Sequence, residues 1–321
     1  MGDERAARGI RILRALRKEP DWAAMSDEQL VAYRDAENRT RSARLTRVIS
    51  GFPDRKAVIG WQRVVLPEHE LRVRVHRPAR PVGVALPLVV HVHGGAFVGT
   101  APQSDWINSH LAVRLPAVVV SVEHRLIGPR TPMLAAVDDG WDVLCEVVRL
   151  ADEWGVDPAR VAVFGESGGA AVTAMAALRA RDDGLPLRAQ VLVNPCADLT
   201  ATALDYPSMR EHADAPVLSV PLLEFVRRLA VPDGADARAV SPLAAADLGR
   251  LAPALIVVPT LDPLADQGRA YAARLRAAGT PARLTEHPGA THAFLSMPGV
   301  VPQARAARAE ITEFLRDHLT P

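Results

Sequence analysis

Hydrophobic residues along the chain follow two spacings, which predict strands that alternate with helices. Short runs that are apolar at nearly every position are typical of parallel strands buried on both faces. Such runs lie at 88–93, 118–122, 161–164, 189–193 and 254–258. A last strand is expected at 282–286, and helical spacing is found at 133–150, 220–229, 267–278 and 311–319. This alternation predicts an α/β fold with a mostly parallel sheet.

The region before the first of these runs has a different pattern. Residues 61–66 form one predicted strand, and residues 71–76 alternate apolar with polar side chains. Alternation of this kind is typical of an antiparallel strand with one exposed face. We therefore expect residues 71–76 to lie at an edge of the sheet.

Two helices are predicted before the first strand. Residues 5–19 have the pattern of a short basic amphipathic helix that ends at Pro20. Ser26 and Gln29 have the spacing of a capping box, which predicts the start of a second helix. Both helices precede the sheet and are candidates for a lid. Later in the chain, residues 200–240 interrupt the alternation of strands and helices with mixed helical sequence.

Length, charge and composition limit the classes of protein to consider. The 321 residues are enough for one large core, or for one core with an accessory cap. The net charge of +1 gives no excess of positive charge of the kind that binds nucleic acid or an anionic membrane. No apolar signal core and no membrane-spanning run is found, so a cytoplasmic location is expected. Cys145 and Cys196 are expected to be small buried core residues rather than a disulfide or a metal site.

A serine stands between glycines where a predicted strand meets a predicted helix, in the sequence Gly165-Glu166-Ser167-Gly168-Gly169. This is the pattern of a nucleophile elbow, a sharp turn that holds a serine above a parallel sheet. Glycines tolerate the strained backbone of such a turn and let the helix approach the strand closely. The pattern also occurs by chance, so its meaning depends on the residues that accompany it.

Two residues further along the chain can supply the acid and the base that a nucleophilic serine needs. In this kind of fold the acid and the histidine follow the serine in that order, each after a strand. Asp262 and His292 both follow predicted strands and are therefore the predicted acid and base. Asp266 lies about one turn into the next helix and is the less favoured acid, while His287 and His212 fit the position of the base less well.

The sequence His93-Gly94-Gly95-Ala96-Phe97 follows an apolar run. At this point the fold supplies a loop whose backbone N–H groups stabilise an oxyanion. Small residues let such N–H groups approach a substrate oxygen closely. A further N–H donor is expected at Gly168, directly after the serine. The elbow, the acid, the histidine and this loop agree on one site and predict a serine hydrolase.

From about residue 71 to the C-terminus, the sequence resembles the hormone-sensitive-lipase-like esterases of the α/β-hydrolase superfamily. The resemblance rests on His93–Phe97, Val120–Leu126, Gly165–Gly169, Ser241–Leu243, Leu261–Leu264 and His292–Phe294. It implies an α/β-hydrolase fold, with a mostly parallel eight-stranded sheet flanked by helices and a helical cap. It also implies hydrolysis of carboxylic esters, commonly with short acyl chains, without a cofactor or metal.

The resemblance further implies how the chain is divided and which groups hold the oxyanion. The N-terminal cap helices, the first part of the core, the cap insertion and the second part of the core would be residues 1–50, 51–199, 200–240 and 241–321. The oxyanion donors would be the N–H groups of Gly95, Ala96 and Gly168.

Several residues depart from the pattern usual in that family. Ala96 replaces a glycine, which keeps the N–H group but puts a methyl group beside the acyl pocket. Glu166 stands where aspartate is usual and Gly168 where alanine is usual, and neither removes a donor or a catalytic side chain. His124 replaces a tyrosine, and residues 128–131 replace an Ala-Pro-Glu-His segment.

The sequence therefore predicts a carboxylesterase in which Ser167, His292 and Asp262 form and hydrolyse an acyl-enzyme. The residues expected to shape the substrate pocket are Trp22, Phe97 and Val98. An acyltransferase or a dedicated metabolite deacetylase with the same three side chains is an alternative, and a non-catalytic ligand receptor on this fold is a less favoured one. The expected partner is a small-molecule ester, and the last strand and helix could pair two subunits in a homodimer.

Overall fold

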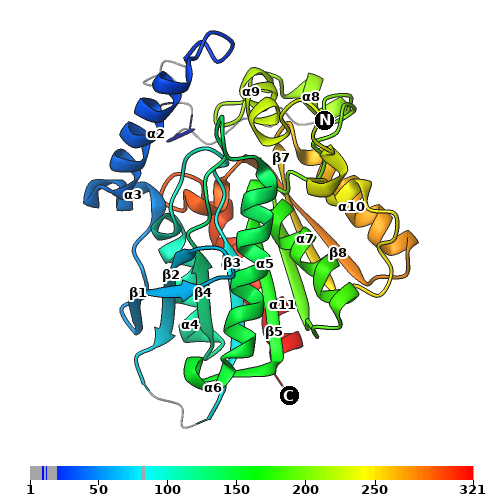
Figure 1. Cartoon of the computed structure of the whole chain (residues 1–321). Coiled ribbons are helices and arrows are strands. Elements are labelled where there is room, and N and C mark those ends of the chain that lie inside the picture. Colours follow the sequence, from blue (N-terminus) through cyan, green and yellow to red (C-terminus); the bar gives the residue numbers. More distant parts are fainter. Residues whose placement is uncertain (1–8, 11, 13–19, 81–83, 321) are drawn as a thin grey trace.

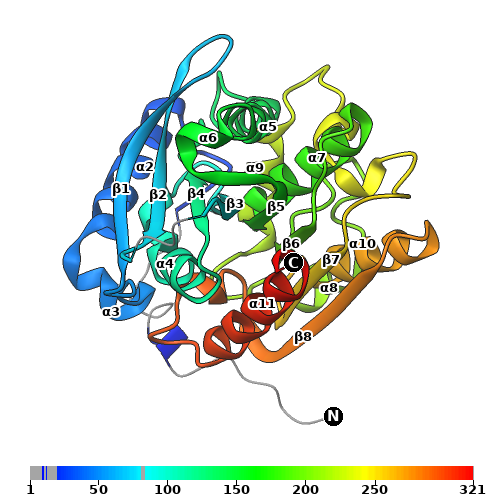
Figure 2. The same cartoon turned by 90° about the horizontal axis from the view of Figure 1, so that it is seen from below.

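The computed structural model describes residues 9, 10, 12, 20–80 and 84–320, and within them eight strands form one sheet. The strands are β1 (Ala57–Val65), β2 (Glu70–Pro78), β3 (Leu86–Val92), β4 (Val118–Val122), β5 (Val156–Glu166), β6 (Ala189–Val193), β7 (Ala254–Leu261) and β8 (Ala282–Thr291). Their spatial order is β1-β2-β4-β3-β5-β6-β7-β8 (Figures 1 and 2). β2 is antiparallel to both of its neighbours, and the other pairs are parallel. The predicted mostly parallel sheet is confirmed.

Helices cover both faces of the sheet (Figure 2). The described α-helices are α2 (Asp27–Ser42), α3 (Arg47–Ser50), α4 (Asp105–Arg114), α5 (Met133–Arg149), α6 (Ala151–Trp154), α7 (Gly168–Asp183), α8 (Pro207–Glu211), α9 (Val220–Ala230), α10 (Ala265–Ala277) and α11 (Gln303–Leu319). α4 and α11 pack on the face that carries Val89 and Val119, whereas α5 and α7 pack on the face that carries Val90 and Val120. α10 covers β7 beside α7.

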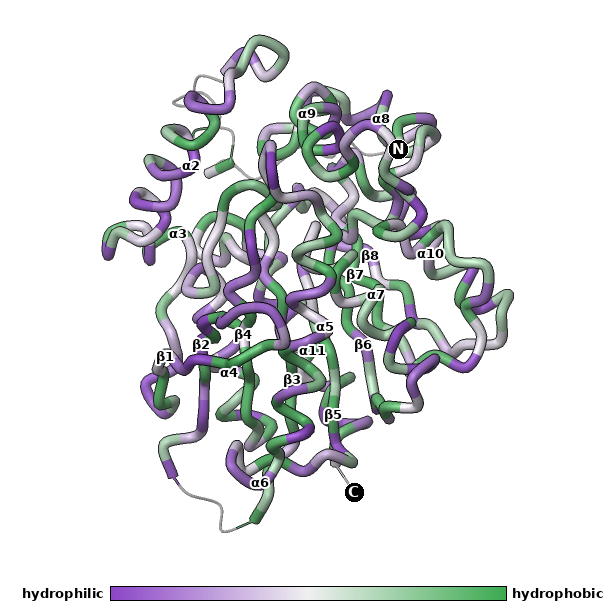
Figure 3. Tube along the Cα trace, in the orientation of Figure 1, coloured by the Kyte–Doolittle hydropathy of each residue, from purple (hydrophilic) through white to green (hydrophobic). Residues whose placement is uncertain are grey.

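The central strands are apolar because both of their faces are covered. All five residues of β4 and all five of β6 are buried. Figure 3 shows hydrophobic stretches along the central strands and mostly hydrophilic stretches along α2. The near-continuous apolar runs in the sequence therefore correctly predicted strands that are buried on both faces.

Residues 71–76 belong to β2, which is not the edge strand that the sequence predicted. β1 pairs with β2 from Ala57 opposite Pro78 to Val65 opposite Glu70 and forms the edge itself. Alternation of apolar and polar residues reports that the two faces of a strand differ in burial. It carries no information on whether the strand has hydrogen-bonded neighbours on both sides, so the prediction was wrong on this point.

The last strand is longer than predicted, because β8 continues through a Pro-Gly pair to Thr291. Its register against β7 shifts between Pro259 and Leu261, and Gly289 has a φ of 73°. A register shift of this kind lets a strand continue through two residues, here proline and glycine, that disfavour strand structure. His287 therefore lies within the strand rather than at its end.

The N-terminal helix predicted at 5–19 lies mostly outside the described residues, although Ile10 is helical and buried. The capping box is confirmed, because Ser26 Oγ accepts the N–H of Gln29 at 3.3 Å and Gln29 Oε1 accepts that of Ser26 at 2.9 Å. α2 then begins at Asp27. α8 and α9 lie in the interrupting segment, and α2 and α9 lie beyond the same end of the sheet (Figure 1).

The two cysteines are free, and Cys196 is buried as predicted. Cys145 is only half-buried on α5, so it is not the core residue that the sequence suggested. Of the helices in the described part of the chain, none has the length and apolar character needed to cross a membrane.

Candidate active site

Ser167 occupies a sharp turn between β5 and α7, with φ 57° and ψ −121°. Backbone angles of this kind are strained for a residue with a side chain, and the flanking strand and helix hold them. A Cβ atom on Gly165 would lie 2.3 Å from the carbonyl oxygen of Gly169, and one on Gly169 would lie 2.3 Å from that of Val92. Glycine is therefore required at both positions, because the helix begins in contact with the strands.

Three side chains from different loops form one hydrogen-bonded chain at the carboxyl end of the sheet. His292 Nε2 lies 2.8 Å from Ser167 Oγ, and His292 Nδ1 lies 2.8 Å from Asp262 Oδ2. Asp262 is fully buried and His292 is 5% exposed. The N–H of Leu264 donates to Asp262 Oδ1 at 2.9 Å and fixes the carboxylate. Neighbouring parallel strands end at one edge of the sheet, so residues distant in the sequence meet there.

The competing acid and base candidates make other contacts. Asp266 Oδ2 accepts the N–H of Ser208 at 2.8 Å, and Asp266 Oδ1 accepts from Arg269 at 2.8 Å. His287 Nε2 lies 3.3 Å from a carboxylate oxygen of Glu310. His212 follows α8 in the interrupting segment. These interactions place Asp266 and His287 outside the hydrogen-bonded chain.

The loop after β3 borders the serine. A Cβ atom on Gly94 would lie 3.2 Å from Ser167 Cβ, and one on Gly168 would lie 3.9 Å from the backbone nitrogen of Ala96. Gly95 and Ala96 have φ values of 117° and 51°. Glycine adopts such values readily and alanine does so with strain, so the replacement of glycine by Ala96 has a backbone cost. The three predicted N–H donors thus come from two segments that face each other.

Two buried histidines lie behind this loop. The rings of His93 and His124 stack with centroids 4.3 Å apart, and His124 Nε2 lies 3.3 Å from the carbonyl oxygen of His93. Burial lowers the pKa of both imidazoles, which keeps them neutral near pH 7. His124 therefore packs against the residue from which the loop begins.

Glu166 connects the elbow to the segment that follows His292. Its Oε2 atom accepts a hydrogen bond from Ser296 Oγ at 2.7 Å, and the residue is 2% exposed. Burial raises the pKa of Glu166 above its ordinary value of 4.5, and the bond from Ser296 opposes this shift. The sequence marks Glu166 as a departure from the family pattern but carries no signal for its partner Ser296.

We expect Glu166→Gln to change how stability depends on pH. Because its pKa is raised on folding, the folded state binds this proton more tightly than the unfolded state does. The wild-type free energy of unfolding should therefore fall as pH rises from about 4.5, the unfolded value, through the folded pKa. Glutamine does not ionise, so the variant should gain stability relative to wild type across that window. Urea unfolding from acidic to neutral pH measures the difference.

The exposed residue Glu313 provides a matched control for this experiment. Glu313→Gln removes one negative charge from an exposed position of α11, so it controls for the change in net charge that Glu166→Gln also makes. Parallel stability curves for wild type and Glu166→Gln would contradict the prediction.

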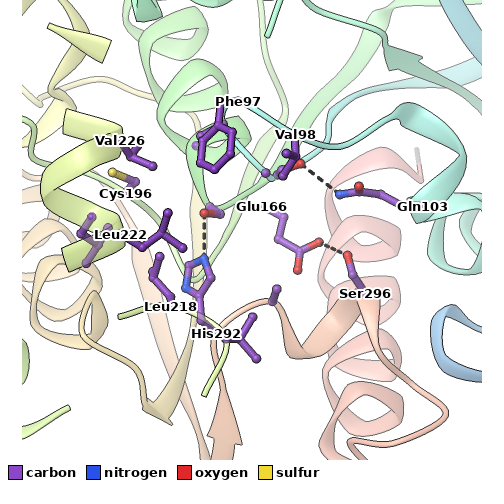
Figure 4. A pocket seen from close by; sticks show the side chains of 18 of the residues that line it. Phe97, Val98, Gln103, Glu166, Cys196, Leu218, Leu222, Val226, His292 and Ser296 are labelled. Atoms are coloured by element: carbon purple, nitrogen blue, oxygen red, sulfur yellow. Dashed lines mark hydrogen bonds between the residues drawn. The ribbon is translucent and has the colours of Figure 1, made fainter. Parts of the chain in front are cut away.

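A cavity of about 390 Å³ opens at Ser167 and His292 (Figure 4). Its lining includes the three residues expected to shape the pocket, Trp22, Phe97 and Val98. Figure 4 shows Leu218, Leu222, Val226 and Cys196 on one side of the cavity, and Gln103 and Ser296 on the other. Burial raises the pKa of the Cys196 thiol to about 12, so this side chain stays protonated.

Much of the cavity wall could not be predicted from the sequence. Leu222, Leu223 and Val226 come from α9, whose apolar spacing was recognised without any sign of what its apolar face would contact. Arg41, from the last turn of α2, also lines the cavity. Within the described part of the chain, no group of three or more histidine, cysteine or acidic side chains is arranged to hold a metal ion.

Residues 89–296 match a family model described as the alpha/beta hydrolase fold. Together with the fold and the loop-borne site, this match shows that the chain belongs to the hormone-sensitive-lipase-like esterase family of α/β-hydrolases. The family, the fold and the class of enzyme predicted from the sequence are thereby confirmed.

Individual relatives agree with this placement. The chain is 38% identical over 245 residues to the carboxylesterase NlhH of Mycobacterium tuberculosis, covering 74% of this chain and 75% of that protein. It is 34% identical over 261 residues to an ethyl acetate hydrolase of Pseudomonas putida, covering 78% and 80%. The hyperthermophilic esterase of the archaeon Pyrobaculum calidifontis has a similar structure, with a TM-score of 0.83, 30% identity and coverage of 95% and 97%.

Proposed function

We propose that the chain is a serine carboxylesterase in which Ser167 is the nucleophile, His292 the base and Asp262 the orienting acid. The observation that carries this proposal is the hydrogen-bonded chain from Ser167 Oγ through both ring nitrogens of His292 to Asp262 Oδ2, with each contact at 2.8 Å. In such an arrangement the carboxylate fixes the tautomer in which Nε2 can accept the serine proton.

The reaction would proceed in two halves. Ser167 Oγ attacks the ester carbonyl carbon while His292 Nε2 takes the hydroxyl proton. The resulting oxyanion is held by the N–H groups of Gly95, Ala96 and Gly168. When the intermediate collapses, the C–O bond to the alcohol breaks and His292 returns the proton to the leaving oxygen. Water then attacks the acyl-enzyme by the same steps, which releases the carboxylic acid and restores the serine.

The size and the largely apolar lining of the cavity support short acyl groups as substrates. Apolar side chains surround much of the cavity, and its volume is about 390 Å³. Trp22 and Phe97 line the cavity and pack with the buried Phe225, with ring centroids 5.5 to 5.8 Å apart. The Pseudomonas putida relative is named for a short ester, ethyl acetate. We infer a preference for short acyl chains, beneath a cap built from residues 1–50 and 200–240.

Hydrolysis of a series of p-nitrophenyl esters, from acetate to long acyl chains, tests this function. We expect turnover to be highest for the short esters and to disappear in Ser167→Ala. Repeating the reaction with a competing alcohol, and analysing the products, separates hydrolysis from acyl transfer. A wild-type protein that is inactive on every ester would contradict the proposal and favour a dedicated substrate or a ligand receptor.

We expect Trp22→Ala to shift the preference toward longer acyl chains. The indole is 5% exposed and lines the cavity, so its removal lengthens the available space. The ratio of kcat/KM for a long ester to that for acetate should rise by about 10-fold. Trp61→Ala is a suitable control, because Trp61 lies on the edge strand β1 and stacks under Arg72. Equal ratios in wild type and Trp22→Ala would remove Trp22 from the set of specificity residues.

A further inference from the structure

Helix α2 is bonded directly to the loop that carries two of the three proposed oxyanion donors. Arg34 Nε donates to the carbonyl oxygen of Phe97 at 2.7 Å, and Arg34 Nη2 donates to that of Ile127 at 2.6 Å. One turn further along the helix, Asn38 Oδ1 accepts the N–H of Gly99 at 2.8 Å. Two side chains of one helix thus hold the loop from its middle and from its end.

The loop needs such external support, because its backbone does not follow a regular structure. Gly95, Ala96 and Gly99 have φ values of 117°, 51° and 113°. Within the loop, the N–H of Val98 donates to the carbonyl oxygen of Gly95 at 2.8 Å and closes one turn. A segment with several left-handed residues is not stabilised by local propensity, so long-range contacts must determine where its N–H groups point.

The second hydrogen bond of Arg34 also leads to the oxyanion loop, through Ile127. The N–H of Ile127 donates to the carbonyl oxygen of Ala96 at 3.2 Å, so the segment held by Arg34 Nη2 is itself bonded to the loop. Burial lowers the pKa of the Arg34 guanidinium, and the charge of neighbouring Asp35 opposes this shift. A guanidinium taken partly out of water and bonded to two carbonyl oxygens is a rigid two-point contact.

We propose that Arg34, assisted by Asn38, is a positioning residue that holds the N–H groups of Gly95 and Ala96 in place to stabilise the oxyanion. The inference rests on the proposed serine esterase function. Arg34 acts on the reaction through the loop, because its hydrogen bonds go to Phe97 and Ile127. The helix that covers the site is thereby also part of the support of its catalytic machinery.

The aromatic packing above the loop adds a second link between the helix and the site. Tyr33, the residue before Arg34, lies 6.3 Å from Phe97 between ring centroids, and Trp22 lies 5.4 Å from Tyr33. All three rings line the cavity. A substrate that fills the cavity therefore lies against rings that pack beside the oxyanion loop.

The test compares Arg34→Gln, Arg34→Lys and Asn38→Ala with wild type in the whole chain of 321 residues. Arg39→Gln is the matched control, because Arg39 is an exposed arginine of the same helix. Two quantities are measured for each variant: kcat and KM for p-nitrophenyl acetate, and Ki for a trifluoromethyl ketone. The serine oxygen adds to the ketone carbon and transfers its proton to the histidine, so the bound ketone carries an oxyanion and its Ki reports the strength of the donors.

We expect Arg34→Gln to lower kcat by about 10- to 100-fold, because small displacements of catalytic groups have effects of that size. KM should change little, and Ki for the ketone should rise in proportion to the loss of kcat/KM. Arg34→Lys should restore part of kcat, since lysine keeps the charge but reaches one carbonyl oxygen at a time. Arg39→Gln should match wild type.

Several outcomes would overturn the inference. These are a wild-type kcat in Arg34→Gln, a change in KM alone, or a lowered kcat with an unchanged Ki for the ketone. If Arg34→Gln does not fold, Asn38→Ala decides the question by the same comparison of kcat with Ki. If only this inference is wrong, the wild type remains active and its activity still depends on Ser167. A wild type that is inactive on every ester overturns both the proposed function and the inference.

Discussion

Replacing Ser167 with alanine is expected to lower kcat for ester hydrolysis on the order of 10⁶-fold. The substitution removes the oxygen that would attack the carbonyl carbon, and His292 then has no hydroxyl to activate. The cavity and the backbone N–H groups around Ser167 remain, so the variant should still bind the substrate. Initial rates on p-nitrophenyl acetate measure the loss of kcat. The affinity for an unreactive alcohol product measures the binding that the variant retains.

The folded state of this variant must be verified, because Ser167 has a positive φ of 57° that alanine also has to adopt. Circular dichroism and thermal unfolding close to wild type would show that the loss is chemical. Substantial turnover by folded Ser167→Ala would place the nucleophile elsewhere and refute the proposed mechanism.

Replacing Asp262 with asparagine is expected to lower kcat about 10⁴-fold. Asp262 is fully buried and lies 2.8 Å from His292 Nδ1, so its charge stabilises the imidazolium that forms when the serine proton is taken. Asparagine is neutral, and its amide group favours the tautomer with the proton on Nε2. That tautomer cannot accept the proton of Ser167. The ester assay measures kcat, with KM expected to stay close to wild type.

Asp266→Asn is the matched control for this prediction. Asp266 is the neighbouring acid in the sequence, but its carboxylate accepts hydrogen bonds from Ser208 and Arg269. Its replacement should therefore leave kcat within a few-fold of wild type. Similar losses in Asp262→Asn and Asp266→Asn would mean that the orienting acid has been assigned incorrectly.

The strands and the order of the chemical groups were predictable because their signals are local. A strand buried on both faces needs apolar residues at nearly every position, and β4 and β6 show this directly. The elbow needs glycine where a Cβ atom would collide with neighbouring backbone, as at Gly165 and Gly169. Ser167, Asp262 and His292 follow strands in the expected order, and they lie in one hydrogen-bonded chain. Their catalytic roles stay predictions.

The wrong predictions concern features that depend on a neighbouring strand, which a local sequence pattern does not report. Alternation in β2 was interpreted as an edge position, although β1 pairs along its outer side. The last strand was expected to end at residue 286, although pairing with β7 carries β8 through the Pro-Gly pair at 288–289 to Thr291. Hydrogen bonding between strands can override weak local preferences, so sequence patterns locate strands better than they locate strand ends and sheet edges.

The sequence by itself determined the fold class, the family and the chemical groups of the candidate site, because each depends on residue types at short spacings. Only the tertiary structure decided what surrounds that site. Leu222 and Val226 reach the cavity from α9, and Arg34 reaches the carbonyl oxygens of Phe97 and Ile127 across 63 and 93 positions of sequence. Contacts of this kind form when chain segments meet in the folded core, and a hydrogen bond to a backbone carbonyl leaves no constraint on the identity of the residue that accepts it.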